Sequence, residues 1–83
     1  MKRFDYTITD PNGLHARPAG LLVKQAQLID GDVMIECRGK SASMKRLLAV
    51  MGLGVRCGDV VTVTVEGSEQ EAEALKAFFR ENF

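Results

Sequence analysis

The 83-residue sequence has no tryptophan, only one histidine, two prolines and two cysteines, and no long hydrophobic run. A membrane-spanning helix needs about 20 apolar residues, and a signal peptide needs an apolar core that the N-terminal MKRFDYTITD lacks. We therefore expect a cytoplasmic protein without membrane insertion. Net charge is absent too, because 11 basic residues balance 11 acidic ones. This balance argues against non-specific binding of nucleic acid.

The two cysteines, Cys37 and Cys57, form neither a CxxC pair nor the paired spacing of a zinc site. We interpret both as reduced thiols, and the sequence predicts no metal and no cofactor. The chain is 46% hydrophobic and 27% charged, which is typical of one globular domain spanning residues 1–83. No second self-complementary surface is evident, so we expect a monomer.

Hydrophobic periodicity predicts the order strand, helix, strand, strand, helix, strand, helix. Strands are expected at residues 3–9, 33–37, 40–44 and 60–66. The first helix is expected at residues 16–27, and the second is a short one of about two turns ended by Gly52 and Gly54. The third helix should follow a capping box formed by Ser68 and Glu71. The strands alternate apolar and polar residues, so each has one buried and one wet side. This pattern predicts an α+β domain with a four-stranded antiparallel sheet covered on one face by three helices.

The only histidine, His15, lies between a turn and a helix start, in the segment GLHARPA at residues 13–19. The unpaired N–H groups of a first helical turn, and the helix dipole, can hold a phosphoryl dianion attached to the ring. Arg17 offers a planar set of donors that matches phosphoryl oxygens, and Pro18 removes no helical hydrogen bond there. The alternative is that His15 caps the helix, Arg17 is solvated and Pro18 simply starts the helix.

GLHARPA resembles the active-site motif of the HPr family, the histidine-containing phosphocarriers of the bacterial phosphoenolpyruvate-dependent sugar phosphotransferase system. Residues 39–43, 51–54 and 58–63 also resemble family segments, so the similarity covers nearly the whole chain. It implies an open-faced β-sandwich, in agreement with the periodicity. It also implies a carrier that is not itself an enzyme: phosphorylated enzyme I would phosphorylate Nδ1 of His15, and an enzyme IIA component would receive the phosphoryl group in sugar uptake.

The resemblance further implies which residues surround the phosphoryl group and which meet the partners. Arg17 would contact the group, the amides of Ala16 and Arg17 would assist, Pro18 would belong to the same site and Asn12 would lie beside it. The docking surface on the first two helices would comprise Ala16, Arg17, Gly20, Lys24, Leu47, Leu48, Met51 and Arg56. The surplus of apolar residues in the short second helix then predicts an exposed interface patch.

Charge is expected to be segregated although it sums to zero. Basic residues cluster around the docking segments (Lys24, Lys40, Lys45, Arg46 and Arg56), and acidic ones gather toward the other end (Glu66, Glu69, Glu71 and Glu73). This distribution predicts steering toward acidic partners, or else two ordinary solvated faces.

Arg46 stands where family members with HPr-based catabolite control carry a kinase-targeted serine, so no regulatory serine is expected there. Ser41 and Ser43 fall in the third predicted strand and inherit no regulatory role. Two alternatives stay open. One is an HPr paralogue of a nitrogen-regulatory or dihydroxyacetone-kinase branch, and the other is a binding module that is never phosphorylated and uses the apolar patch of the second helix.

Overall fold

The computed structural model describes residues 1–83 as seven elements. The strands are β1 (Lys2–Thr7), β2 (Val33–Cys37), β3 (Lys40–Ser43) and β4 (Val60–Val65), and the helices are α1 (Ala16–Gln27), α2 (Leu47–Met51) and α3 (Glu69–Asn82). Their order is the predicted one. The largest boundary error is at the end of β1, which stops at Thr7 because the chain then turns toward the site described below.

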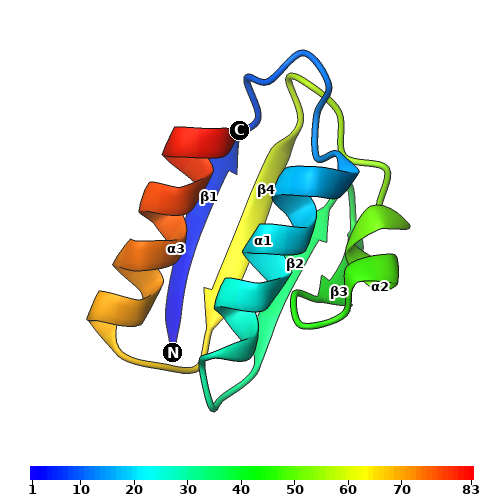
Figure 1. Cartoon of the computed structure of the whole chain (residues 1–83). Helices are drawn as coiled ribbons and strands as arrows, with labels where there is room; N and C mark the ends of the chain where they lie inside the picture. The colour runs from blue at the N-terminus through cyan, green and yellow to red at the C-terminus, as the bar shows by residue number, and fades with distance from the viewer.

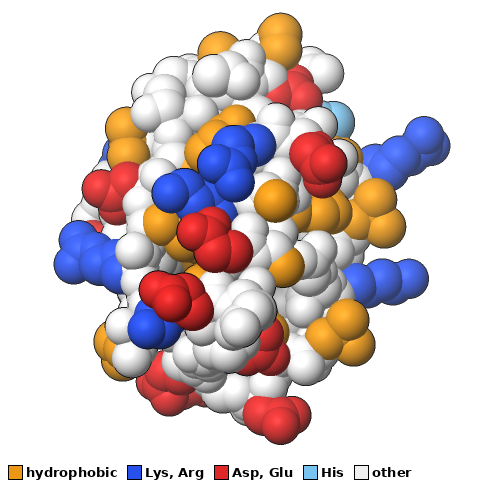
Figure 2. Space-filling model, turned by 90° about the vertical axis from the view of Figure 1, so that its left-hand side faces the viewer, with side chains coloured by type: hydrophobic (Ala, Val, Ile, Leu, Met, Phe, Trp, Pro, Cys, Tyr) orange, Lys and Arg blue, Asp and Glu red, His pale blue; other side chains and the backbone are white.

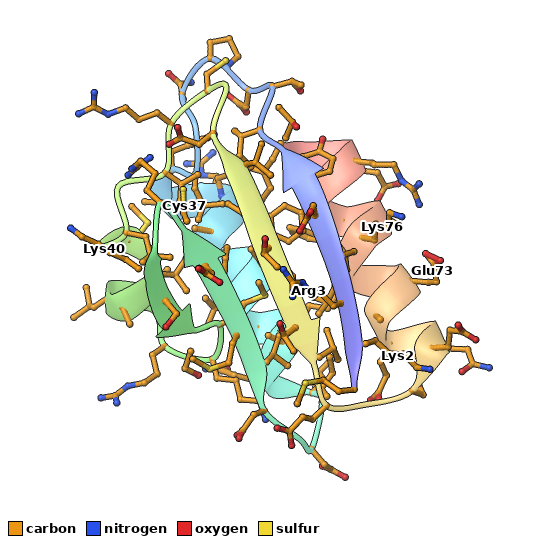
Figure 3. All side chains as sticks on the ribbon, turned by 180° about the vertical axis from the view of Figure 1, so that it is seen from behind. Lys2, Arg3, Cys37, Lys40, Glu73 and Lys76 are labelled. Carbon is orange, nitrogen blue, oxygen red and sulfur yellow. The ribbon has the colours of Figure 1, made fainter.

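The four strands form one antiparallel sheet in the order β1-β4-β2-β3, with Val63 of β4 opposite both Phe4 and Ile35. All three helices lie on one side of this sheet, and α1 runs between α2 and α3 (Figure 1). The opposite side, viewed in Figure 3, carries no helix. The predicted α+β class, an open-faced β-sandwich with helices on one face, is confirmed.

Strand alternation divides the sheet into a buried and a wet face. In β4, Val61, Val63 and Val65 are buried, while Thr62 and Thr64 face the open side. The helices cover the valines with apolar stripes, which are Ala19, Leu22, Val23 and Ala26 in α1 and Ala72, Leu75 and Phe79 in α3. No polar or charged residue is buried, so the ionisable side chains, apart from the Cys37 thiol, lie at or near the surface.

Helix α2 has five residues, which is less than the predicted two turns. A helix this short is unstable alone, and contacts at both ends hold it in place. The side-chain amide of Gln27 donates to the Lys45 carbonyl at 2.9 Å before the helix, and the Arg38 guanidinium donates to the Gly54 carbonyl at 3.1 Å after it. Val50 anchors its inner side in the core. The helix ends at Met51, with Gly52 as its C-cap.

Candidate functional site

His15 is the residue immediately before α1, and its backbone is extended, with φ −103° and ψ 167°. Its side chain makes no hydrogen bond to the helix amides, so the alternative of His15 as a side-chain cap is wrong. The side chain is 39% exposed. This exposure leaves the ring open to a reactive group carried by another protein.

Two neighbours orient the imidazole. Its Nε2 atom lies 3.3 Å from Oδ2 of Asp10, and its edge-to-face contact with the Phe83 ring has a centroid separation of 6.4 Å. Nδ1 has no hydrogen-bonding partner in the chain. The two ring nitrogens therefore differ, with Nε2 engaged and Nδ1 free.

Asp10 is held on both sides of its carboxylate. Oδ1 accepts the Asn12 N–H at 2.8 Å, and Oδ2 faces His15. The donated Asn12 amide, and to a smaller extent the His15 ring, hold the pKa of Asp10 below its ordinary value against the opposing effect of burial. Asp10 therefore stays an anion, and an anion can only accept hydrogen bonds.

The start of α1 leaves two backbone donors free. Ala16 and Arg17 donate to no acceptor in the chain, Pro18 has no N–H, and the first amide with a helical partner is that of Ala19, which donates to the His15 carbonyl at 3.0 Å. Both free amides belong to exposed residues. The Arg17 guanidinium likewise makes no hydrogen bond or ion pair within the chain, so these donors are available to an anion.

Asn12 reaches the site through its backbone. It lies in the turn that Gly13 closes by donating its N–H to the Asp10 carbonyl at 2.9 Å. The Asn12 side chain makes no hydrogen bond in the chain and is exposed. The structure thus connects Asn12 to His15 by way of Asp10, which the sequence-based prediction did not include.

Part of the predicted docking surface forms one open hollow between α1 and α2. Four of the predicted residues line it, Arg17, Gly20, Lys24 and Leu47, together with Leu21, Val23 and Gln27, which were not predicted. Leu48 is 86% exposed, so the predicted apolar patch exists at this position. Met51 is half-buried against the core, so it contributes less to the patch than expected.

Arg56 does not join that hollow. It lines a second one with Arg38, Lys40 and Asp59, and its N–H donates to Asp59 at 2.8 Å. Lys45, expected in the basic cluster around the docking segments, donates a hydrogen bond from its ammonium to the Ile29 carbonyl. The structure therefore splits the predicted basic cluster.

The acidic end is less uniform than the sequence suggests. Glu69 and Glu73 of α3 share a surface hollow with Lys2 and Lys76. Acidic and basic side chains alternate over the face of the molecule that carries α3 (Figure 2), and Lys2, Glu73 and Lys76 lie along the same flank in Figure 3. Lys2, which is distant in sequence, and Lys76, which belongs to α3 itself, lie among these glutamates, so the expected segregation of charge is not found on this face.

The sequence assigns no role to Ser41, Ser43, Cys37 and Cys57. Ser41 faces Glu36 and Ser43 faces Met34 across the β2–β3 pair, and Met34 and Glu36 lie on the exposed side of β2. Cys37 is buried, Cys57 is exposed, and neither forms a disulfide. No group of three or more His, Cys, Asp or Glu side chains comes together as a metal site, and no helix is long and apolar enough to cross a membrane.

Two residues at the site escaped prediction. Asp10 opens the turn DPNG, and an Asp at this position commonly accepts a backbone N–H two residues on. The sequence could therefore have predicted that the Asp10 carboxylate is fixed by the turn. The Phe83 contact had none, because it joins residues at opposite ends of the sequence.

The family model described as "PTS HPr component phosphorylation site" matches residues 2–81. The chain belongs to the HPr family. A histidine-containing phosphocarrier protein from Mycoplasma is 30% identical, with 96% of this chain and 93% of that one covered and a TM-score of 0.91. A phosphocarrier protein HPr from Bacillus anthracis is 37% identical, with 93% and 94% covered and a TM-score of 0.84.

A third relative has a different name within the same fold. Crh of Bacillus subtilis, described as a catabolite repression protein that forms an intertwined dimer by swapping, is 32% identical. Coverage is 98% of this chain and 95% of that one, with a TM-score of 0.74. Family membership therefore supports a role in the phosphotransferase system, and the particular partners are a separate question.

Proposed function

We propose that this protein carries phosphoryl groups in sugar uptake, accepting them on Nδ1 of His15 from phosphorylated enzyme I and passing them to an enzyme IIA component. The observation that carries the proposal is the asymmetry of the His15 ring. Nε2 faces Asp10, while Nδ1 is unpaired, beside a helix start with two free amides.

The transfer needs little from the protein beyond geometry. The Nδ1 lone pair attacks phosphorus, the P–N bond of the donor's phosphohistidine breaks, and the electron pair of that bond returns to the donor's ring nitrogen. The amides of Ala16 and Arg17 and the Arg17 guanidinium would then hold the phosphoryl oxygens. The same steps, with donor and acceptor exchanged, deliver the group to the next protein.

Docking would use the hollow between α1 and α2. It combines the cations Arg17 and Lys24 with the apolar side chains of Leu21 and Leu47, and the exposed Leu48 extends the α2 surface. Apolar centres with charged margins are typical of protein interfaces, and the cations favour acidic partners. We propose that the carrier is a cytoplasmic monomer, a state that the swapped dimer of Crh makes worth measuring.

The phosphotransfer pathway that the protein serves depends on which partners it binds. Crh is linked by its name to catabolite repression, and family resemblance places the regulatory serine of that role where this chain has Arg46. Arginine cannot be phosphorylated by a serine kinase, so we assign no co-repressor role. A nitrogen-regulatory or dihydroxyacetone-kinase branch would use the same His15 chemistry with other partners.

The test is incubation with phosphoenolpyruvate and enzyme I, followed by intact mass and phosphorus NMR of the protein and of His15→Ala. We expect one acid-labile phosphoryl group on Nδ1 that is absent from the variant. The variant should fold, because His15 makes no capping bond and its loss should cost at most about 1 kcal/mol. No uptake, with enzyme I competent on another carrier, would contradict the proposal and favour the non-phosphorylated binding module.

A further inference from the structure

Asp10 is fixed more firmly than any other charged residue near His15. Its N–H donates to the Phe83 main-chain oxygen at 2.8 Å, and its carbonyl accepts the Gly13 N–H at 2.9 Å. Its carboxylate meets Asn12 on one oxygen and His15 on the other. All its polar groups are engaged, so the oxygen that faces His15 has a defined position.

A carboxylate facing one ring nitrogen decides where a neutral imidazole keeps its proton. The acceptor favours the proton on Nε2, and the lone pair is then on Nδ1. No other polar group in the chain reaches the ring, and Phe83 only restricts its rotation from the side. The choice between tautomers therefore falls to Asp10.

We propose that Asp10 is a positioning residue that holds His15 in the Nε2–H tautomer, so that Nδ1 is the nucleophile. This inference rests on the proposed phosphocarrier function for its consequence, but the tautomer itself is a property of the free protein. After transfer to Nδ1 the ring keeps the Nε2 proton and is cationic, and the adjacent carboxylate stabilises that charge. Retaining the proton lets the ring leave as neutral imidazole in the onward step.

Asp10→Asn is the most informative variant, because it preserves the turn and replaces the hydrogen-bond acceptor that faces Nε2 with a donor. The Asn oxygen still accepts the Asn12 N–H, and the amide NH₂ then points at Nε2 as a donor. A donor at Nε2 favours the proton on Nδ1, which removes the attacking lone pair. Asp10→Ala removes the partner altogether, and Asp30→Asn is the matched control, since Asp30 is exposed and makes no side-chain hydrogen bond.

The first readout is the ¹⁵N chemical shifts and the long-range ¹H–¹⁵N correlations of the free His15 ring, at a pH where the ring is neutral. We expect the Nε2–H tautomer in the protein and in Asp30→Asn, the Nδ1–H tautomer in Asp10→Asn, and a mixture in Asp10→Ala. An Nδ1–H tautomer in the protein itself, or the same tautomer in all four, would overturn the proposal. This measurement needs no phosphorylation, so it stands even if the proposed function fails.

The second readout is the rate of phosphoryl acceptance from enzyme I at saturating and at low carrier concentration. We expect Asp10→Asn to be about tenfold slower at saturation, equivalent to about 1.4 kcal/mol, with an unchanged concentration for half-maximal rate. A structural defect would instead alter docking as well. If the tautomer reverses but the rate does not fall, the positioning role is wrong while the phosphocarrier function stands.

Discussion

Gly13 shows how one residue places the site. Its φ is 66°, and a Cβ at this position would lie 2.5 Å from the Val55 carbonyl oxygen, which also accepts the Leu14 N–H at 3.1 Å. Only glycine allows this approach. This contact joins the loop that precedes His15 to the loop that precedes β4, so two connected segments fix the position of the histidine.

The two cysteines should differ sharply in reactivity. Burial raises the pKa of the Cys37 thiol against the opposing influence of Arg38, and its side chain is 2% exposed, whereas Cys57 is exposed. Thiolates are the reactive form, and a buried protonated thiol is inert. Native protein should therefore incorporate one equivalent of iodoacetamide rapidly, at Cys57 by peptide mapping.

Denatured protein provides the control, since both thiols should then react at similar rates. Rapid labelling of Cys37 in the native state would show that the end of β2 opens more readily than its burial implies.

At the scale of elements, the sequence predicts what depends on near neighbours in the chain. The capping box of α3 is confirmed, with the Glu71 N–H donating to Ser68 Oγ at 3.0 Å and the Ser68 N–H donating to Glu71 at 2.8 Å. Strand faces follow from alternation in the same way. The length of α2 was overestimated: it has five residues, because the residues before Leu47 are not helical, with Arg46 extended at φ −122° and ψ 107°, and Gly52 caps the other end.

The same distinction between near and distant neighbours in the chain applies to the site. His15, Arg17 and the free helix amides are adjacent in sequence and were predicted together. Arg56 was assigned to the docking surface by similarity alone, and its backbone lies against Gly13 through a contact between segments far apart in the sequence. Tertiary contacts of this kind leave no periodic trace in a sequence.

Helix α2 offers a test of the docking surface. Leu48→Glu should slow phosphoryl acceptance from enzyme I about five- to tenfold, mainly by weakening docking, because it places a charge on an apolar interface residue. The fold should be unaffected, since Leu48 is 86% exposed. The measurement is the acceptance rate over a range of carrier concentrations.

Leu28→Glu is the matched control for that experiment. Leu28 is 82% exposed but lies after α1, in a hollow it shares with Ala74 of α3. The Leu28→Glu variant should accept phosphoryl groups from enzyme I at the normal rate. Equal slowing by both substitutions would mean that added negative charge, wherever it lies, opposes the partner, and that α2 has no special place in docking.

For the whole molecule, two carboxylates connect stability with pH. The pKa of Asp59 is held low chiefly by the hydrogen bond from the Arg56 N–H, against the opposing effect of burial and with further help from Arg38, and the pKa of Asp10 is held low chiefly by the Asn12 N–H. Each group therefore stabilises the folded state fully above its unfolded pKa of about 4, and this contribution is lost as pH falls through the lower folded value.

We expect the free energy of unfolding, measured by urea denaturation with circular dichroism, to fall as the pH is lowered below about 4. Asp59→Asn should flatten part of this decline. Because backbone amides are the main cause in both cases, 0.5 M salt should change the decline little, whereas dependence on surface ion pairs would make it strongly salt-sensitive. A decline abolished by salt would contradict this assignment.

The anchoring of α2 at both ends has a consequence for the proteins that meet it. A surface already ordered before contact loses little conformational entropy on association, and it also has little freedom to reshape itself. Under the proposed function, one rigid docking surface must bind an upstream phosphoryl donor and several downstream phosphoryl acceptors in turn. Those proteins must therefore do the adapting: each needs a surface that fits the same hollow and the exposed Leu48, and differences among the partners' own surfaces set the selectivity.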